Sequence, residues 1–228
     1  MSRFATIAAS LAFAIALPGM ANAAPVTVRD NPDNGGSVFA AGLARSINIE
    51  LDGMSRSVGA GAFSLQYGSD ADGWTDFLTF CLQLRETLTL PKDHERVSST
   101  DYIMDSDDRD ALGILYGNFM DVTLGLKDAN SAAAMQAIVW EITEDGASAF
   151  DLTSGVFKLL TVDVLAEANT LWGLIISGVY APVDFNVFAA EGTQDLLTAS
   201  VPVPAALPLL LSGLAGLGFA SRQKKARP

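Results

Sequence analysis

The chain has 228 residues, with 26 acidic and 14 basic side chains, one cysteine and one histidine. This length provides for one domain with a substantial core. The acidic excess argues against nucleic acid as a partner, because such a surface repels anionic polymers. A single cysteine excludes an internal disulfide.

Residues 1–23 have the pattern of a secretory signal peptide. Arg3 gives a positive start, Ile7–Ala16 is an apolar core too short to span a bilayer, and Ala21–Ala23 has the small-x-small form of a cleavage site. We therefore expect the mature chain to begin at Ala24 after export through the inner membrane.

Residues 24–200 are predicted to form one domain whose front half is an antiparallel β meander. Apolar and polar residues alternate around Ile47–Leu51 and around Phe63–Tyr67, as in half-buried strands. A third strand region is predicted over Thr75–Leu90. Turn signals separate these stretches at Asn31–Ser37, Asp52-Gly53 and Gly68–Gly73.

The middle of the body predicts helices. Asp107–Asp110 places acidic residues at a first helix start, Asn130-Ser131 caps a second helix over about Ala132–Thr143, and a third runs over about Val162–Ser177. A closing strand follows near Val183–Val187. The predicted class is α+β: an antiparallel β-rich domain with an inserted helical block, flanked by the signal peptide and a short C-terminal hydrophobic helix. The apolar faces of the first and third helices are Ala111, Leu112, Leu115, Tyr116 and Val164, Ala168, Leu171, Ile175.

The lone cysteine and a lone amide are the candidate reactive groups. In a continuous strand, Cys81 shares the polar face with Thr79 and Gln83, whereas Phe80 and Leu82 share the apolar face. Gln136 is the only amide in an apolar helical run and needs a partner if it is buried. Trp140 stands one turn further along the same helix face. A cysteine that acts only as a small buried hydrophobe is the alternative.

Phe80-Cys81-Leu82 followed by Met135-Gln136-Ala137-Ile138-Val139-Trp140 resembles the two signature segments of bacterial thioester domains. Gln194–Leu197 also resembles a segment of exported proteins that carry this domain. The resemblance implies that the Cys81 thiol displaces ammonia from the Gln136 amide and leaves an internal thioester, shielded by Phe80 and Trp140. The alternative for this pair is a simple hydrogen bond with no thioester.

Other candidate sites are weaker. His94, the only histidine, cannot make a zinc site alone and is expected in a solvated loop, although it could act as a base. Asp105–Asp110 departs from a calcium loop at positions five and six and is better explained as a helix start. Glu141 and Glu144 are expected on an exposed helix face rather than as a glycosidase pair. No metal or other cofactor is expected.

The tail, residues 201–228, contains a Pro-bearing motif, an apolar run over Ala205–Ala220 and a basic end. The run has 16 residues, just short of the ~17–25 that span a bilayer. This order resembles the VPLPA-type PEP-CTERM sorting signal, which implies an exosortase-type membrane protease as partner and only transient anchoring in the inner membrane. A plain membrane anchor is the alternative. The motif residues are Val201, Pro202, Val203, Pro204 and Ala205.

Together these patterns predict a protein of the cell surface or extracellular matrix. Loss of both signals removes five basic residues, which leaves 14 − 5 = 9 basic against 26 acidic side chains and a net charge of −17. The resemblance implies covalent adhesion to an extracellular amine or hydroxyl, with at most one acyl transfer per molecule rather than enzymatic turnover. A noncovalent structural component of an exopolysaccharide or biofilm matrix is the alternative.

Overall fold

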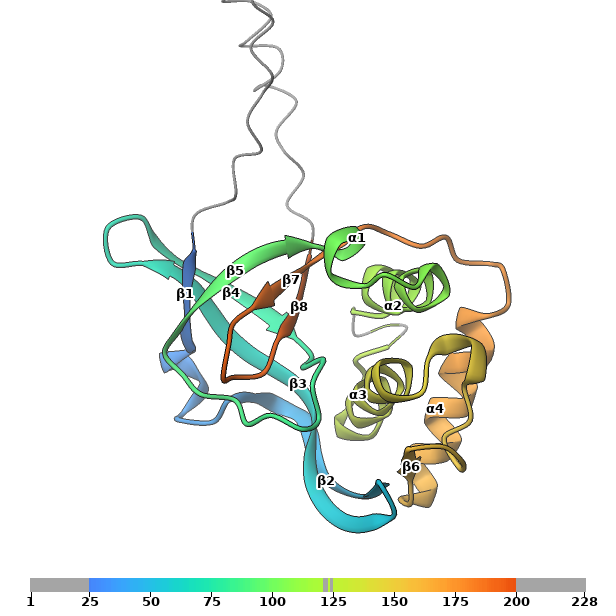
Figure 1. The fold of residues 1–228 in the computed structure, drawn as a ribbon. Coiled ribbons are helices and arrows are strands. Elements are labelled where there is room, and N and C mark those ends of the chain that lie inside the picture. The colour runs from blue at the N-terminus through green and yellow to red at the C-terminus, as the bar shows by residue number, and fades with distance from the viewer. Residues whose placement is uncertain (1–24, 121–122, 124, 200–228) are drawn as a thin grey trace, which may run out of the picture.

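The computed structural model describes residues 25–120, 123 and 125–199 of the protein. They form a mixed α+β fold with an antiparallel sheet, as predicted at the level of fold class (Figure 1). The segments predicted to be a signal peptide, a sorting motif and a hydrophobic tail lie outside the described residues. Within the described part, no helix is long and apolar enough to cross a membrane. The strands are β1 Val26–Asp30, β2 Phe39–Leu51, β3 Met54–Ser69, β4 Gly73–Thr79, β5 Lys92–Ser98, β6 Phe157–Leu159, β7 Phe185–Ala189 and β8 Leu196–Ala199; the helices are α1 Ser99–Tyr102, α2 Ser106–Phe119, α3 Ala129–Glu144 and α4 Val162–Ile175, with short 3-10 turns η1 Pro32–Asn34 and η2 Ala147–Ala149.

The long strand β3 joins two parts of the sheet. Its N-terminal half pairs with β2, which also pairs with β6, and its C-terminal half lies between β1 and β4. From β1 the pairing continues through β5 and β7 to β8. Just beyond β4, Phe80–Leu82 runs antiparallel to the start of β8, where Leu82 N donates to the Asp195 carbonyl at 2.9 Å and Leu197 N to the Phe80 carbonyl at 3.0 Å. The strands β1, β3, β4, β8, β7 and β5 therefore close into a ring.

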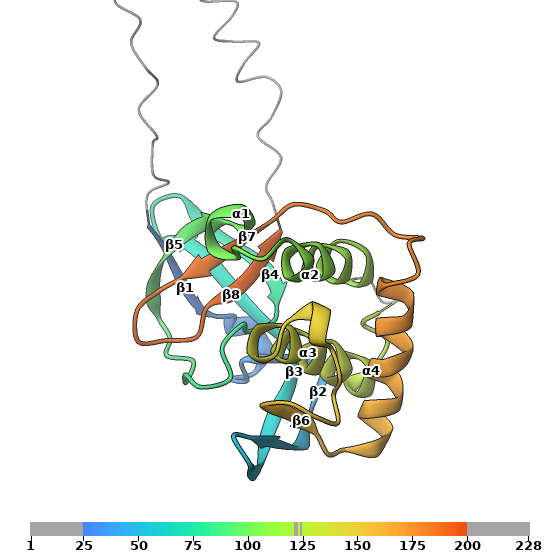
Figure 2. The same ribbon diagram turned by 45° about the vertical axis from the view of Figure 1, so that its right-hand side comes forward.

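Helix α3 is the centre of the helical block. It packs against β2 and β3 on one side and against α4 on another, with α2 also in contact (Figures 1 and 2). Every residue from Ser131 to Ile142 is buried. A helix covered on all sides is apolar over most of its surface, which explains why this stretch has no amphipathic stripe; its buried polar residues are Ser131, Gln136 and Glu141.

Several predicted features are confirmed. The Asp52-Gly53 turn joins β2 to β3 with positive φ at both residues, 53° and 76°, and the Gly68–Gly73 cluster lies at the β3–β4 turn. The predicted apolar faces of α2 and α4 are buried. The acidic start of α2 is also confirmed, because Asp107 and Asp108 lie in its first turn; their backbone N–H groups donate to the side chain of the cap residue Asp105.

Other predictions are wrong. The strand predicted over Thr75–Leu90 ends at Thr79, and Val183 is exposed and precedes the closing strand β7. The second helix begins at Ala129, because Asp128 rather than Asn130-Ser131 caps it and accepts from the Asn130 and Ser131 N–H groups at 2.9 Å each. Strands β1, β5, β6 and β8 were not predicted.

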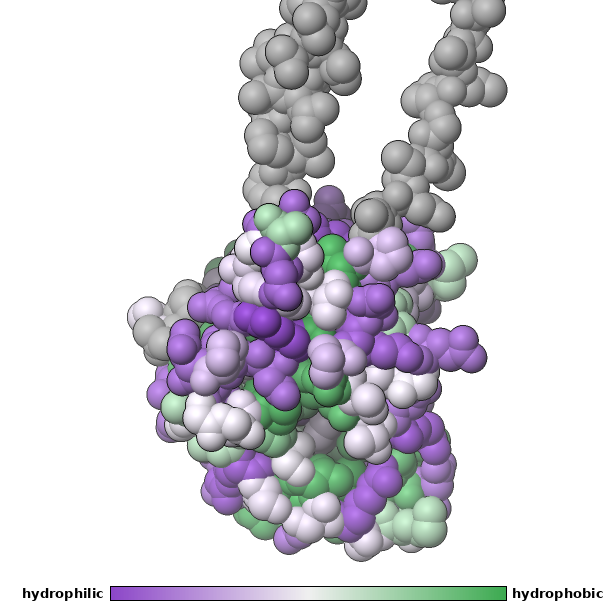
Figure 3. Space-filling view, turned by 90° about the vertical axis from the view of Figure 1, so that its left-hand side faces the viewer, coloured by the Kyte–Doolittle hydropathy of each residue, from purple (hydrophilic) through white to green (hydrophobic). Residues whose placement is uncertain are grey.

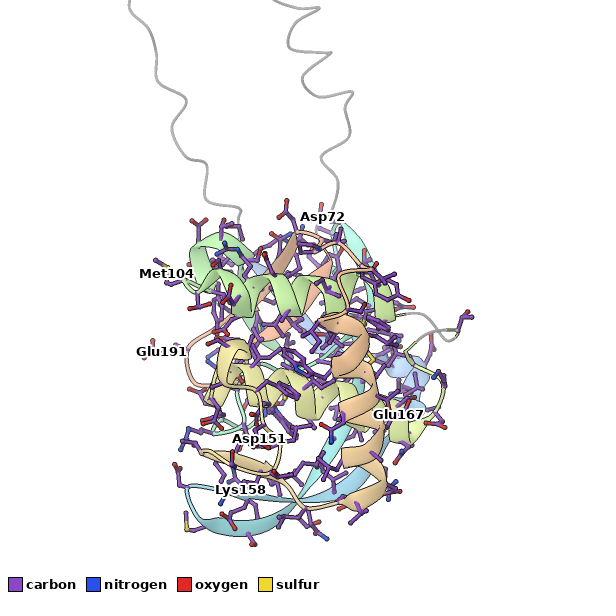
Figure 4. All side chains as sticks on the ribbon, turned by 90° about the vertical axis from the view of Figure 1, so that its right-hand side faces the viewer. Asp72, Met104, Asp151, Lys158, Glu167 and Glu191 are labelled. Atoms are coloured by element: carbon purple, nitrogen blue, oxygen red, sulfur yellow. The ribbon has the colours of Figure 1, made fainter. Side chains whose placement is uncertain are left out.

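The surface carries the acidic excess. Among the side chains labelled in Figure 4, Asp72, Asp151 and Glu191 are exposed and Glu167 is partly exposed, and they lie on different sides of the molecule. On the face shown in Figure 3, hydrophilic residues are interspersed with hydrophobic ones, which gather around a hollow in its lower half.

Candidate functional site

Cys81 lies where the chain leaves β4 and crosses to β8. Its backbone forms an isolated antiparallel bridge with Leu196, and its side chain is only 1% exposed. The predicted polar strand face is therefore wrong at this position. Phe80, Cys81 and Leu82 are all buried, because the segment has left the regular strand and is covered by β8 as well as by α3.

Gln136 lies in the middle of α3 and is also 1% exposed. Its amide pairs with the backbone of Cys81 in both directions: the Cys81 N–H donates to Oε1 at 3.2 Å, and Nε2 donates to the Cys81 carbonyl at 2.8 Å. This double contact is the partner that a buried amide requires. It also orients the Gln136 amide so that its oxygen, Oε1, lies on the side of the Cys81 thiol.

The Cys81 thiol lies against the carbonyl group of the Gln136 side chain. Sγ is 3.6 Å from Oε1. Because a C=O bond is about 1.23 Å long, Sγ is at most about 4.8 Å from the amide carbon. The structure thus brings the two predicted residues side by side, chain segment against helix, although 55 positions separate them in the sequence.

The electrostatics of this pair favour a neutral thiol. Burial raises the pKa of Cys81 to about 12, and a hydrogen-bond interaction with the Trp140 side chain opposes this rise. The backbone N–H that donates to Oε1 polarises the amide carbonyl, as an oxyanion donor does. The arrangement can therefore activate the carbonyl carbon while it keeps the sulfur uncharged.

The two residues predicted to shield the bond are both buried. Phe80 is 0% and Trp140 is 2% exposed, and the indole packs edge-on against Phe157 with ring centroids 6.2 Å apart. The indole N–H is buried without a hydrogen-bond partner of normal geometry.

A clamp that was not predicted as such holds the segment after Cys81. The Gln194 side chain donates to the carbonyls of Gln83 and Glu86 at 3.0 and 2.8 Å. Asp195 accepts from the Gln83 side chain at 2.8 Å and from the Tyr102 hydroxyl. The sequence signal for this clamp was the Gln194–Leu197 segment, whose polar residues join the start of β8 to the segment after Cys81.

A cavity of about 420 Å³ begins one residue after Cys81, although neither Cys81 nor Gln136 lines it. Its wall includes Leu82, the residue after Cys81, whose carbonyl accepts from the Thr143 hydroxyl at 2.9 Å. Apolar side chains form much of the lining, and charged ones stand among them. The remaining lining residues are Gln83, Leu84, Arg85, Glu86, Tyr102, Ile103, Asp108, Leu112, Ile142 and Glu144.

His94 is buried, not solvated as predicted. It lies on β5, is 0% exposed, and its Nδ1 is 2.9 Å from the Lys92 carbonyl. Nδ1 therefore donates to this carbonyl, and Nε2 is buried without a hydrogen-bond partner. The strand buries this side chain because alternate positions of β5 face the inside of the ring.

Glu141 is buried as well, which corrects the prediction that it lies on an exposed helix face. Its side chain is 0% exposed; Oε1 accepts from the Asp151 N–H at 2.8 Å and Oε2 has no partner. Burial raises the pKa of Glu141 to about 7, and the neighbouring charges of Asp145 and Asp151 add to the rise. Glu144 instead bonds Arg85 at 2.8 Å, so the two acids do not face each other as a catalytic pair does.

Within residues 25–120, 123 and 125–199, no group of three or more His, Cys, Asp or Glu side chains could hold a metal ion. In comparisons with known proteins, no family model, no curated protein and no solved structure matches the chain. The case for a function therefore depends on the residues of this chain.

Proposed function

We propose that the chain is an exported cell-surface or matrix protein that attaches covalently through a Cys81–Gln136 thioester. Export rests on the sequence patterns of residues 1–23 and 201–228, the latter read as a sorting signal for an exosortase-type protease. The partner surface would supply an amine or hydroxyl. Each molecule would react once, so the protein would not be an enzyme.

The observation that carries the proposal is the contact of a buried thiol with a buried, oriented amide, with Sγ 3.6 Å from Oε1. A thioester is an activated acyl group that water hydrolyses, and both residues are 99% removed from solvent. Phe80 and Trp140 contribute to that exclusion. The cavity lined by Leu82 lies one residue from Cys81 but does not reach either member of the pair, so an incoming group would need a local opening at Leu82.

The proposed chemistry has two steps. In the first, the Cys81 sulfur bonds to the amide carbon of Gln136, the C–N bond breaks, and the thiol proton leaves with the nitrogen as ammonia. The Cys81 carbonyl, which accepts from Nε2, holds the departing nitrogen, and the Cys81 N–H stays on the carbonyl oxygen. In the second, an external amine or hydroxyl bonds to the same carbon and the sulfur leaves as the thiol.

The alternative is a noncovalent matrix component in which no thioester forms. One observation favours it: the Gln136 amide already has both of its polar ends satisfied by the Cys81 backbone. A purely structural role would explain why an amide stands in an apolar helix. The two functions differ in whether an external amine ends up bonded to Gln136.

Capture of a labelled primary amine tests the proposal. The wild-type protein should take up one label at Gln136 and release one free thiol, whereas Cys81→Ala and Gln136→Ala should take up none. Gln66→Ala is a matched control, because this buried glutamine bonds Arg29 and Asp76 instead; it should react like the wild type. Capture that survives in either site variant would exclude this pair, and a wild type that captures nothing would support the matrix role.

A further inference from the structure

Shielding of the thioester from water does not explain why residue 140 is a tryptophan, because the indole N–H is a polar group. It is buried and has no hydrogen-bond partner of normal geometry. Buried donors in native proteins are nearly always satisfied, so an exception calls for a reason. An apolar side chain of the same shape would exclude water equally well without this penalty.

The position of Trp140 points its side chain toward the reacting pair. It follows Gln136 by one helical turn, so both side chains are on the same face of α3. On this face, Gln136 bonds the backbone of Cys81 and Thr143 donates to the Leu82 carbonyl. Trp140 therefore lies between two contacts of α3 with the segment that carries the thiol. A neutral thiol is a weak acceptor, whereas a thiolate is a strong one because its hydrogen bonds are charge-assisted.

We propose that Trp140 is a catalytic hydrogen-bond donor to the sulfur of Cys81 when the thioester is opened. This inference rests on the proposed function and assigns a residue to its second step. The nitrogen of the attacking amine bonds to the Gln136 carbonyl carbon, and the C–S bond breaks. The bonding electron pair goes to the sulfur, and the proton lost by the nitrogen ends there as S–H. Trp140 donates its hydrogen bond throughout and transfers no proton.

The sulfur needs such a donor because its surroundings disfavour negative charge. Burial raises the pKa of the Cys81 thiol, and no positive charge of the described residues lowers it. An interaction that is weak with the neutral sulfur and strong with the departing one stabilises the transition state more than the ground state, which is the condition for catalysis.

Shielding and hydrogen bonding predict opposite results when the N–H is removed. If Trp140 only excludes water, Trp140→Phe admits water and hydrolysis of the thioester becomes faster. If Trp140 donates to the leaving sulfur, both hydrolysis and reaction with methylamine become slower. Loss of one donor to a developing charge slows catalysis by about 10²–10³ in oxygen systems, and we expect about tenfold for the softer sulfur.

The experiment measures both rates on the full exported chain, by mass, for wild type and Trp140→Phe. Replacing Trp140 with benzothienylalanine, which keeps the shape and lacks the N–H, covers the case in which phenylalanine disturbs folding. Trp172→Phe is the matched control. Trp172 is on α4, and its indole stacks on the ring of Phe150 with the ring centroids 3.8 Å apart. Slower methylamine capture and hydrolysis in both position-140 variants are expected. Unchanged or faster rates in the benzothienylalanine variant, with its thioester intact, would overturn this inference alone; a wild type without any thioester would overturn the proposed function as well.

Discussion

Gln136 and Cys81 should differ sharply in what they contribute to stability, although the proposed function requires both for capture. Gln136→Ala removes the partners of the Cys81 N–H and carbonyl, both inside a site that is 1% exposed. A buried polar group left without a partner costs about 1–3 kcal/mol, so two such groups cost roughly 2–6 kcal/mol. Cys81→Ala leaves both hydrogen bonds in place, since they involve only the backbone of residue 81. It opens a small cavity that costs on the order of 1 kcal/mol.

Thermal and urea unfolding of the two variants measure this difference directly. Neither variant can form a thioester, so any cross-link present in the wild type does not enter the comparison. For a domain of 150–250 residues, 1 kcal/mol corresponds to about 2–4 °C in Tm, and Gln136→Ala should therefore unfold at least roughly 2 °C below Cys81→Ala. Equal unfolding temperatures would refute the reasoning, because they would mean that the Gln136 amide does not satisfy the backbone of residue 81.

Three further predictions concern the cross-link, pH and helix capping. Methylamine should lower the unfolding free energy of the wild type by up to about 4 kcal/mol, because it opens a cross-link around a 55-residue loop. The same treatment should leave the stability of Cys81→Ala unchanged. An unchanged stability of the wild type as well would contradict a cross-link. The raised pKa of Glu141 gives a stability contribution that is fully present below its ordinary value of 4.5 and is lost as the pH rises through about 7; its size is at most roughly 3 kcal/mol. In urea unfolding, the stability of Glu141→Gln should therefore fall less between pH 5 and 8 than that of the wild type. An equally steep fall in both proteins would mean that burial does not raise this pKa. Asp128→Ala should cost about 1 kcal/mol through loss of the α3 cap, whereas Asp110→Ala, an exposed acid on α2, should stay within about 0.5 kcal/mol in the same unfolding assay; equal effects would argue against the cap.

The helices were the most predictable part of the fold. The stripe of Val164, Ala168, Leu171 and Ile175 has helical spacing because one face of α4 packs on the core, and all four residues are buried. Short-range signals such as this need no knowledge of the rest of the chain. The same holds for the Asp52-Gly53 turn, whose conformation depends on two adjacent residues.

Strand β5 shows why other elements were missed. Its inward positions carry His94 and Arg96, so the apolar alternation of a half-buried strand is absent. Arg96 can face inward because its guanidinium lies over the rings of Tyr67 and Phe188, at 5.3 and 5.1 Å from the ring centroids. That arrangement depends on strands distant in sequence, and the local pattern of β5 does not reveal it.

The candidate site was predictable in part for a related reason. A lone cysteine and a lone amide in an apolar helix are visible in the sequence, and the resemblance of their surroundings pairs them. The burial of Cys81 could not be predicted, because the alternation of apolar and polar residues in the sequence continues past Thr79, where the strand ends in the structure. The clamp of Gln194 and Asp195 on the segment after Cys81 joins residues more than 100 positions apart, which no local pattern encodes.

The intact mass of the exported protein tests the central claim most directly. A Cys81–Gln136 thioester predicts a mass lower by one ammonia than that of the amide form, a deficit that disappears in Cys81→Ala and is replaced by the added mass of methylamine after incubation. The mass of an unmodified Cys81 and Gln136 in freshly purified wild-type protein, with no incorporation of methylamine, would contradict the account.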